Sequence, residues 1–245
     1  MGALLSVVAL PAGAGAYEVA SVADGGSLSG VVRFAAPPPR LPQMPAARGV
    51  EACDEARQAE ALVLGPGGGV RGGVVLVEGV ARGKKPGGEA VLDAQRCVFV
   101  AHVTATTAGA RMLVKNGDAV LHHPRGLAGR TTVFDLALPH RHDTIDVGRR
   151  LTRPGVVRVL CGAHPHMSAW LVVHDSPYVA VTDERGAYTI DGIPPGRYRV
   201  TLWHEGYRAR GADREGRPRW EEPRTVTRAV TIAPHGSARL DFELR

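Results

Sequence analysis

Aromatic side chains are scarce in this sequence, and long apolar runs are missing. Phe, Trp and Tyr make up 5% of the 245 residues, and no apolar run approaches the roughly 18 residues that a membrane-spanning helix needs. With 44% apolar and 22% charged residues, the chain can still fold around one large or two small cores. Val and Thr recur in short runs between abundant Gly and Pro, which favours strands and tight turns. We expect an all-β protein.

The signatures of common enzyme active sites are absent as well. The sequence contains no G-x-S-x-G elbow, Walker loop or H-E-x-x-H motif. Each of these motifs supplies a nucleophile, a phosphate cradle or a zinc site to a large class of enzymes. We therefore do not expect an enzyme.

Lysine is rare, because 27 of the 30 basic residues are arginines. The net charge of +6 has the sign that a nucleic-acid partner would require. However, the arginines alternate with acidic residues, most clearly over 208–224. This mixture indicates a solvated loop and no nucleic-acid partner, and it leaves a weak docking surface for an acidic partner as an alternative.

The first 16 residues combine a short apolar stretch with a run of small residues ending in Ala14-Gly15-Ala16. This pattern is typical of a signal peptide and its cleavage site, although a basic start is missing. A buried first strand is the alternative. We predict a signal peptide over 1–16 and export to the periplasm or the medium.

Only three cysteines occur, which is an odd number for an exported protein. The simplest assignment is a disulfide between Cys53 and Cys97, with the Cys161 thiolate protected from oxidation by a metal. Three unpaired buried thiols would be the alternative in a cytosolic protein.

Cys161 begins the heptapeptide C-G-A-H-P-H-M, which places a thiol, an imidazole and a thioether at three-residue intervals. With Pro165 stiffening the turn, Cys161, His164 and Met167 can point into one concavity. Soft sulfur ligands beside imidazole select copper, and a blue-copper site needs a second histidine. The segment 115–124 offers His122 and His123, of which we favour His122.

Two stretches carry a specific resemblance. F-V-A-H-V-T-A-T-T-A-G-A-R-M-L-V-K-N-G-D-A-V-L-H and G-V-V-R-V-L-C-G-A-H-P-H-M-S-A-W-L-V-V resemble the cupredoxin family over about 85 residues, and the short C-x-x-H-x-x-M loop is most similar to the amicyanin and plastocyanin type. The resemblance implies a Greek-key sandwich with one type 1 (blue) copper bound by His122, Cys161, His164 and Met167. Cupredoxins usually have Asn after the first histidine ligand, where this chain has His123, and close relatives have Pro where it has Ala101. The usual link between the two ligand loops is therefore in doubt.

A second resemblance covers the C-terminal part. T-D-E-R-G-A-Y-T-I, I-P-P-G-R-Y and the following G-Y resemble the carboxypeptidase regulatory-like domain, a small β-sandwich. Residues 26–34 and 72–80 of this chain resemble the two strands that open that domain. The resulting prediction is a signal peptide (1–16), N-terminal strands of the regulatory-like sandwich (17–90), an inserted cupredoxin domain (91–175) and the rest of that sandwich (176–245).

The remaining histidines have simpler explanations. We expect His102 to be hydrogen-bonded near the copper end, and His140 and His142 to lie in a solvated loop. We expect His166, His174 and His235 to face solvent. The triplet Trp203-His204-Glu205 recurs in methylamine-utilisation-like proteins, which this chain resembles, and is expected to pack against the copper domain.

Taken with the resemblance, these features predict an exported blue-copper protein that carries single electrons. The implied partner is a redox protein such as a c-type cytochrome or a dehydrogenase, reached through a histidine ligand exposed within an apolar patch. A copper carrier or sensor built on the same residues, or a β-sandwich scaffold without enzymatic activity, are the alternatives.

Overall fold

A computed structural model describes residues 17–44, 53, 57–214 and 216–245. The predicted signal peptide lies outside the described residues. Strands dominate the described chain, and its helical segments are short, such as the 3-10 turns Pro66–Gly68 and Gly148–Arg150. The all-β prediction is therefore confirmed. Within these residues, no helix is long and apolar enough to cross a membrane.

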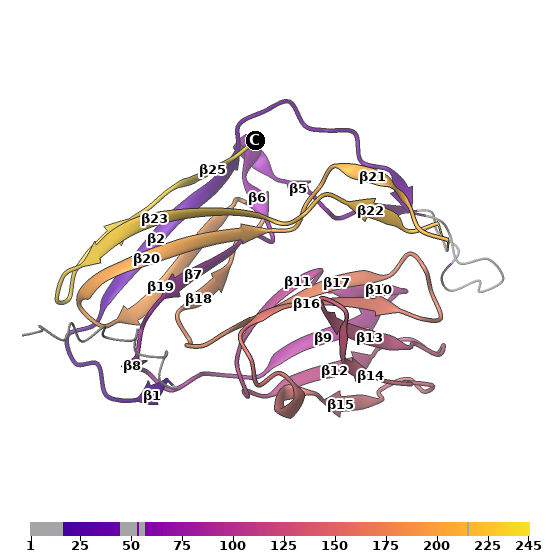
Figure 1. The fold of residues 1–245 in the computed structure, drawn as a ribbon, viewed down its shortest axis with the longest axis horizontal. Helices are drawn as coiled ribbons and strands as arrows, with labels where there is room; N and C mark the ends of the chain where they lie inside the picture. Colours follow the sequence, from indigo (N-terminus) through magenta and orange to yellow (C-terminus); the bar gives the residue numbers. More distant parts are fainter. Residues whose placement is uncertain (1–16, 45–52, 54–56, 215) are drawn as a thin grey trace, which may run out of the picture.

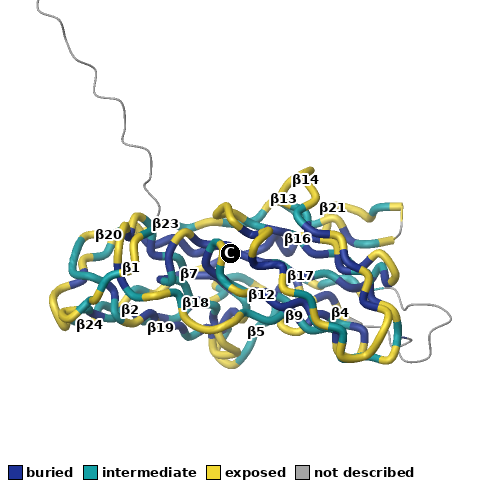
Figure 2. The backbone as a smooth tube through the Cα atoms, turned by 90° about the horizontal axis from the view of Figure 1, so that it is seen from below, coloured by how far each residue is buried: buried dark blue, intermediate teal, exposed yellow. Residues whose placement is uncertain are grey.

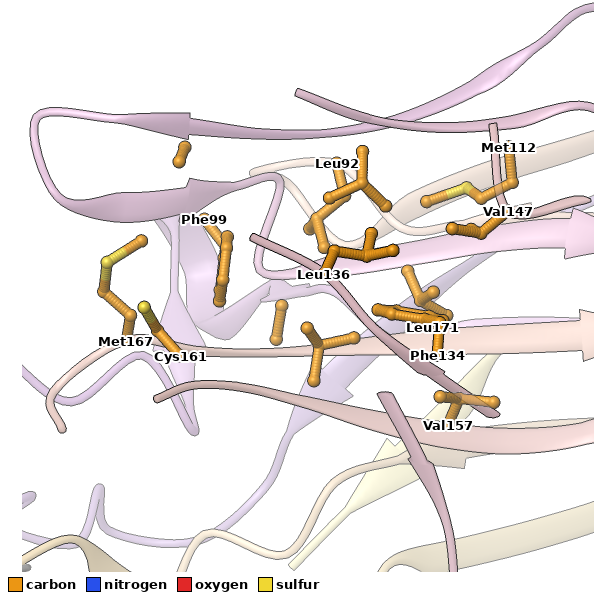
Figure 3. Packing of buried hydrophobic residues seen from close by; sticks show 14 of the residues in the cluster. Leu92, Phe99, Met112, Phe134, Leu136, Val147, Val157, Cys161, Met167 and Leu171 are labelled. Carbon is orange, nitrogen blue, oxygen red and sulfur yellow. The ribbon is translucent and has the colours of Figure 1, made fainter. Parts of the chain in front are cut away.

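The histidine-rich part of the chain forms a two-layer sandwich, here called the first sandwich (Figure 1). Its smaller sheet has the order β10 (Val98–Val100), β9 (Ala90–Gln95), β12 (Met112–Asn116) and β15 (Thr144–Asp146). Its larger sheet has the order β11 (Val103–Thr107), β17 (Ser168–His174), β16 (Gly155–Cys161), β13 (Pro124–Ala128) and β14 (Thr131–Asp135). Leu92, Phe99, Leu136 and Leu171 fill the space between the sheets (Figure 3).

The second sandwich combines strands from both ends of the chain. One sheet has the order β18 (Val179–Val181), β7 (Val74–Glu78), β20 (Gly196–His204) and β23 (Arg224–Ile232). The other has the order β19 (Ala187–Ile193), β2 (Gly26–Phe34) and β24 (Ser237–Arg239), with β25 (Phe242–Leu244) also paired to β2. Side chains alternate between buried and partly exposed along most of β2, as expected for a strand with one covered face.

Four short two-stranded ladders complete the described fold. They are β1 (Glu18–Val19) with β8 (Arg82–Gly83), β3 (Gln43–Met44) with β4 (Arg57–Gln58), β5 (Val63–Leu64) with β6 (Val70–Arg71), and β21 (Ala209–Ala212) with β22 (Pro218–Trp220). The β21–β22 hairpin extends from the second sandwich alongside one end of the first (Figure 1).

The two sandwiches share a buried interface. Val74 and Trp203 of the second sandwich pack with Val103 and Val172 of the first, and the ring centroids of Trp203 and Trp170 lie 5.7 Å apart. The end of β20 is consequently buried on both faces, which breaks the usual strand alternation. Buried backbone runs through both sandwiches, with exposed residues concentrated at the loops (Figure 2). The expected packing of Trp203 against the histidine-rich part is confirmed.

Candidate metal centre

Neighbouring strands bring His122 and Cys161 together. Cys161 is the last residue of β16 and pairs with Pro124 of β13. His122 lies two residues before the start of β13 and exchanges two backbone hydrogen bonds with Leu138, at 3.0 and 2.9 Å. Because antiparallel partners lie side by side, residues about 40 positions apart in the sequence become neighbours.

Three predicted ligands converge at this point. The Cys161 Sγ atom lies 3.6 Å from Nδ1 of His164 and 4.0 Å from Nδ1 of His122. All three ligand atoms lie within 4.8 Å of one another. The residues are buried, with 0%, 3% and 0% exposure for Cys161, His164 and His122. One ion can therefore contact the thiol and both Nδ1 atoms.

Met167, the fourth predicted ligand, closes the same loop. Its backbone N–H donates to the carbonyl of His164 at 3.0 Å, and its carbonyl accepts from the N–H of Cys161 at 3.2 Å. Its side chain is buried. Figure 3 shows the sulfur-containing side chains of Cys161 and Met167 next to each other at one end of the core, close to Phe99.

His123 replaces the expected Asn, yet the two ligand loops remain connected. The His123 backbone N–H points at Cys161 Sγ at 3.4 Å, and the His123 carbonyl accepts from the N–H of Gly162 at 2.8 Å. The His123 ring pairs with Asp135 instead, at 2.5 Å. A Cβ at position 162 would lie 2.6 Å from His123 Nδ1, so a larger residue there would push the His123 ring aside. The backbone thus makes the link that the sequence left in doubt.

Asp118 orients His122 and was not identified from the sequence. Its carboxylate accepts from His122 Nε2 at 3.0 Å and from the backbone N–H groups of Arg96 and Cys97 at 2.7 and 2.8 Å. A proton held on Nε2 leaves the lone pair of Nδ1 directed toward Cys161. The only available signal was an aspartate four residues before the histidine.

Both histidines are held as neutral imidazoles. Burial lowers the pKa of His122, against the opposing effect of Asp118. Burial, followed by the nearby His122 and His166 rings, lowers the pKa of His164 to about 4. Neutral imidazole is the form that binds metals, so no proton has to be displaced from Nδ1 near neutral pH.

The disulfide between Cys53 and Cys97 is present, which confirms the predicted pairing. The Cys53 sulfur lies 3.6 Å from His164 Nε2 and covers the outer edge of that ring. The expectation that a ligand histidine reaches the surface is therefore wrong for His164 and for His122. The expectation that His166 faces solvent is also wrong, because it is buried with Nε2 2.9 Å from the Cys97 carbonyl.

A charged pair at the interface lies next to the loop 161–167. His102 Nδ1 is 3.0 Å from the carbonyl of Ser168, as expected for a hydrogen-bonded residue near this end, and its Nε2 pairs with Glu205. Trp170 Nε1 donates to the second oxygen of Glu205 at 2.7 Å. Burial alone would lower the pKa of His102, but Glu205 overcomes this effect and raises the pKa to about 9. The predicted contact of Glu205 with the histidine-rich sandwich is confirmed.

This pair predicts a loss of stability at alkaline pH. The pKa of His102 is raised to about 9 when folded and lies near 6.5 in an unfolded chain. The full contribution is therefore present below about pH 6.5 and is lost as pH rises through about 9, a change of about 3 kcal/mol in the free energy of unfolding. Urea unfolding across this range should show the decline. Glu205→Gln should remove most of this pH dependence, whereas Glu222→Gln on the exposed surface should leave it unchanged. Equal pH dependence in the two variants would contradict the assignment of the effect to the His102–Glu205 pair.

A cavity of about 280 Å³ lies between the sandwiches and reaches this centre. Its lining includes Met167 and His102 from the first sandwich, and Glu205 and Trp220 from the second. The disulfide covers His164. Among the four predicted ligands, Met167 is the one that lines this cavity, although its side chain is almost fully buried.

Comparison with known proteins gives two kinds of similarity. The carboxypeptidase regulatory-like domain matches residues 165–245, about a third of the chain. This match starts before the predicted boundary at 176 and includes β17, which pairs with β11 and β16 of the first sandwich. No curated protein matches the chain.

Among solved structures, the chain is similar to copper proteins at low identity. A Cu-containing nitrite reductase from Thermus scotoductus SA-01 is 14% identical over 37% of this chain and 25% of its own, with a TM-score of 0.31. This match thus spans about a quarter of that protein. A purple cupredoxin from Nitrosopumilus maritimus is 16% identical over 34% of this chain and 98% of its own, with a TM-score of 0.30. Amicyanin from Paracoccus versutus is 16% identical over 41% of this chain and 97% of its own, with a TM-score of 0.27.

Proposed function

We propose that this protein is an exported blue-copper protein of the cupredoxin type that carries single electrons between redox partners. One type 1 copper would be held by Cys161, His122 and His164, with Met167 as a fourth, weaker ligand. The observation that carries the proposal is the convergence of the Cys161 thiol with two Nδ1 atoms, at 3.6 and 4.0 Å, in a buried position.

The chemistry of the donor set fits copper. A thiolate and a thioether are soft ligands, and two imidazoles complete the set that blue-copper sites use. The His123 N–H points at Cys161 Sγ and stabilises negative charge there. Asp118 fixes the orientation of the His122 ring. When bound, copper would supply the reversible one-electron change, while these residues keep the site dry and its shape constant.

The proposed partner is another redox protein, such as a c-type cytochrome or a dehydrogenase, and the proposed location is the periplasm or the medium. Both follow from the resemblance and from the predicted signal peptide. Leu121, beside ligand His122, is 48% exposed, and Val100 is 42% exposed. These two side chains offer apolar contact points for such a partner close to the site.

The covered ligands favour a second function, a copper carrier or sensor. His164 has its outer nitrogen against the disulfide, and all four proposed ligands are buried. Covered ligands slow the loss of an ion to competing ligands, which a site that retains copper requires, and they leave neither His122 nor His164 with an exposed edge for a redox partner. The rate of electron exchange distinguishes the two functions, because an electron-transfer protein needs fast exchange and a copper carrier or sensor does not.

The test is titration of the protein with Cu(II). We expect an intense visible thiolate-to-copper band that saturates at one equivalent, and reversible one-electron voltammetry. A His140→Ala/His142→Ala variant, which changes exposed loop histidines, should behave like the native protein. A colourless protein that binds no copper would overturn both functions. Tight binding with slow, irreversible electron exchange would favour the carrier or sensor.

A further inference from the structure

We propose that Arg217 of the second sandwich is a positioning residue for the loop 161–167, and that this sandwich thereby controls the metal centre. This inference rests on the proposed function insofar as the loop binds copper. It is carried by two hydrogen bonds that cross from one sandwich to the other. Arg217 Nη2 donates to the carbonyl of Cys161 at 2.9 Å, and Nε donates to the carbonyl of Pro165 at 3.0 Å.

The two acceptors lie on either side of a proposed ligand. Cys161 is itself a ligand, and Pro165 directly follows His164. One rigid guanidinium therefore fixes the span of backbone that contains His164 and sets its approach to Cys161. Lysine cannot do the same, because its ammonium is a point charge without the planar fork.

Arg217 is itself held in place within the β21–β22 hairpin. Its backbone N–H donates to Asp213 Oδ1 at 2.8 Å, and its carbonyl accepts from the Asp213 N–H at 2.9 Å. These bonds close the turn and direct the side chain to the first sandwich. The backbone of Arg217 is thus fixed within the hairpin that carries it.

The second sandwich also holds the far end of the loop. Glu205 pairs with His102, and His102 bonds the carbonyl of Ser168, the residue after Met167. The loop is therefore held at Cys161 and Pro165 by Arg217, and just beyond Met167 through His102. Both points of attachment depend on charged residues of the second sandwich, which gives this sandwich a role in the copper chemistry.

The test compares Arg217→Met with Arg219→Met. Arg219 lies in the same hairpin, but its guanidinium is exposed and donates to Ala212 of its own hairpin at 3.2 and 3.1 Å. In the metal-free protein, Arg217→Met should accelerate hydrogen exchange of the Cys161, Gly162 and Met167 amides about tenfold or more, the effect of losing a charge-assisted hydrogen bond. In the copper-loaded protein it should weaken copper affinity about 10- to 100-fold.

Arg217→Lys serves as the second variant, since it keeps the charge and solubility. Arg217→Lys should recover less than half of the copper affinity that Arg217→Met loses, measured on a logarithmic scale. Equal exchange rates and equal affinity in the Arg217→Met and Arg219→Met proteins would overturn the proposal, as would full recovery by lysine. If the native protein binds no copper, the proposed function fails, whereas the exchange comparison in the metal-free protein still decides the role of Arg217.

Discussion

Cys161→Ser should abolish the visible band of the copper-loaded protein. The band arises from charge transfer between a thiolate and Cu(II), and a serine hydroxyl is a hard, neutral donor near pH 7 that cannot replace it. Copper affinity should fall by at least about a hundredfold, the upper end of the loss on removing a partner that only orients a ligand, because the thiolate ligand itself is lost while the imidazoles remain. Visible absorption and competition with a chelator measure the two effects.

The structure provides a matched control for this substitution. Cys53 and Cys97 are also buried sulfur atoms near His164, but they are joined in a disulfide. Cys53→Ser/Cys97→Ser should retain the band, since neither residue belongs to the proposed ligand set. If the band persisted in Cys161→Ser and disappeared in the double variant, Cys161 would not be the thiolate ligand.

Removing the disulfide should instead lower the free energy of unfolding. The bond closes a loop with a sequence separation of 44 residues, and the loop-entropy relation gives about 4 kcal/mol for a loop of that length. Both sulfurs are replaced together so that no reactive thiol remains. Urea unfolding of the metal-free protein at neutral pH measures the change.

The same double variant should open the site to exchange. The Cys53 sulfur covers His164 Nε2 in the native protein, and its loss leaves that edge of the ring open to water. Copper release to a chelator should then become faster, without a change in the position of the band. For the stability prediction, an unfolding free energy of the double variant within about 1 kcal/mol of the native value would contradict a stabilising role of the disulfide.

Local patterns were sufficient to predict much of this structure. Alternating short strands gave the all-β class, and the spacing in C-G-A-H-P-H-M placed Cys161, His164 and Met167 on one turn. His122 could be proposed because an antiparallel sandwich brings an earlier strand beside the loop. The Cys53–Cys97 pairing followed from the count of cysteines and the assignment of the third to a metal.

Contacts between distant segments could not be read in this way. Asp118 orients His122 through a carboxylate that has no distinctive motif. Arg217 lies in an arginine-rich stretch, and nothing local separates it from Arg219. His174 was expected at the surface, but it is buried with Nε2 3.0 Å from the Val77 carbonyl of the second sandwich. Arg217 and His174 acquire their roles only when the two sandwiches pack together, whereas Asp118 depends on contacts within the first sandwich.

The central claim is that Cys161, His122, His164 and Met167 bind one copper ion. The most direct measurement is anomalous diffraction at the copper edge from crystals of the copper-loaded protein. A single strong peak bonded to Cys161 Sγ and to Nδ1 of both His122 and His164, with Met167 sulfur at a longer distance, is the predicted result. A peak only at exposed histidines such as His140 and His142, with the buried cluster empty, would contradict the account.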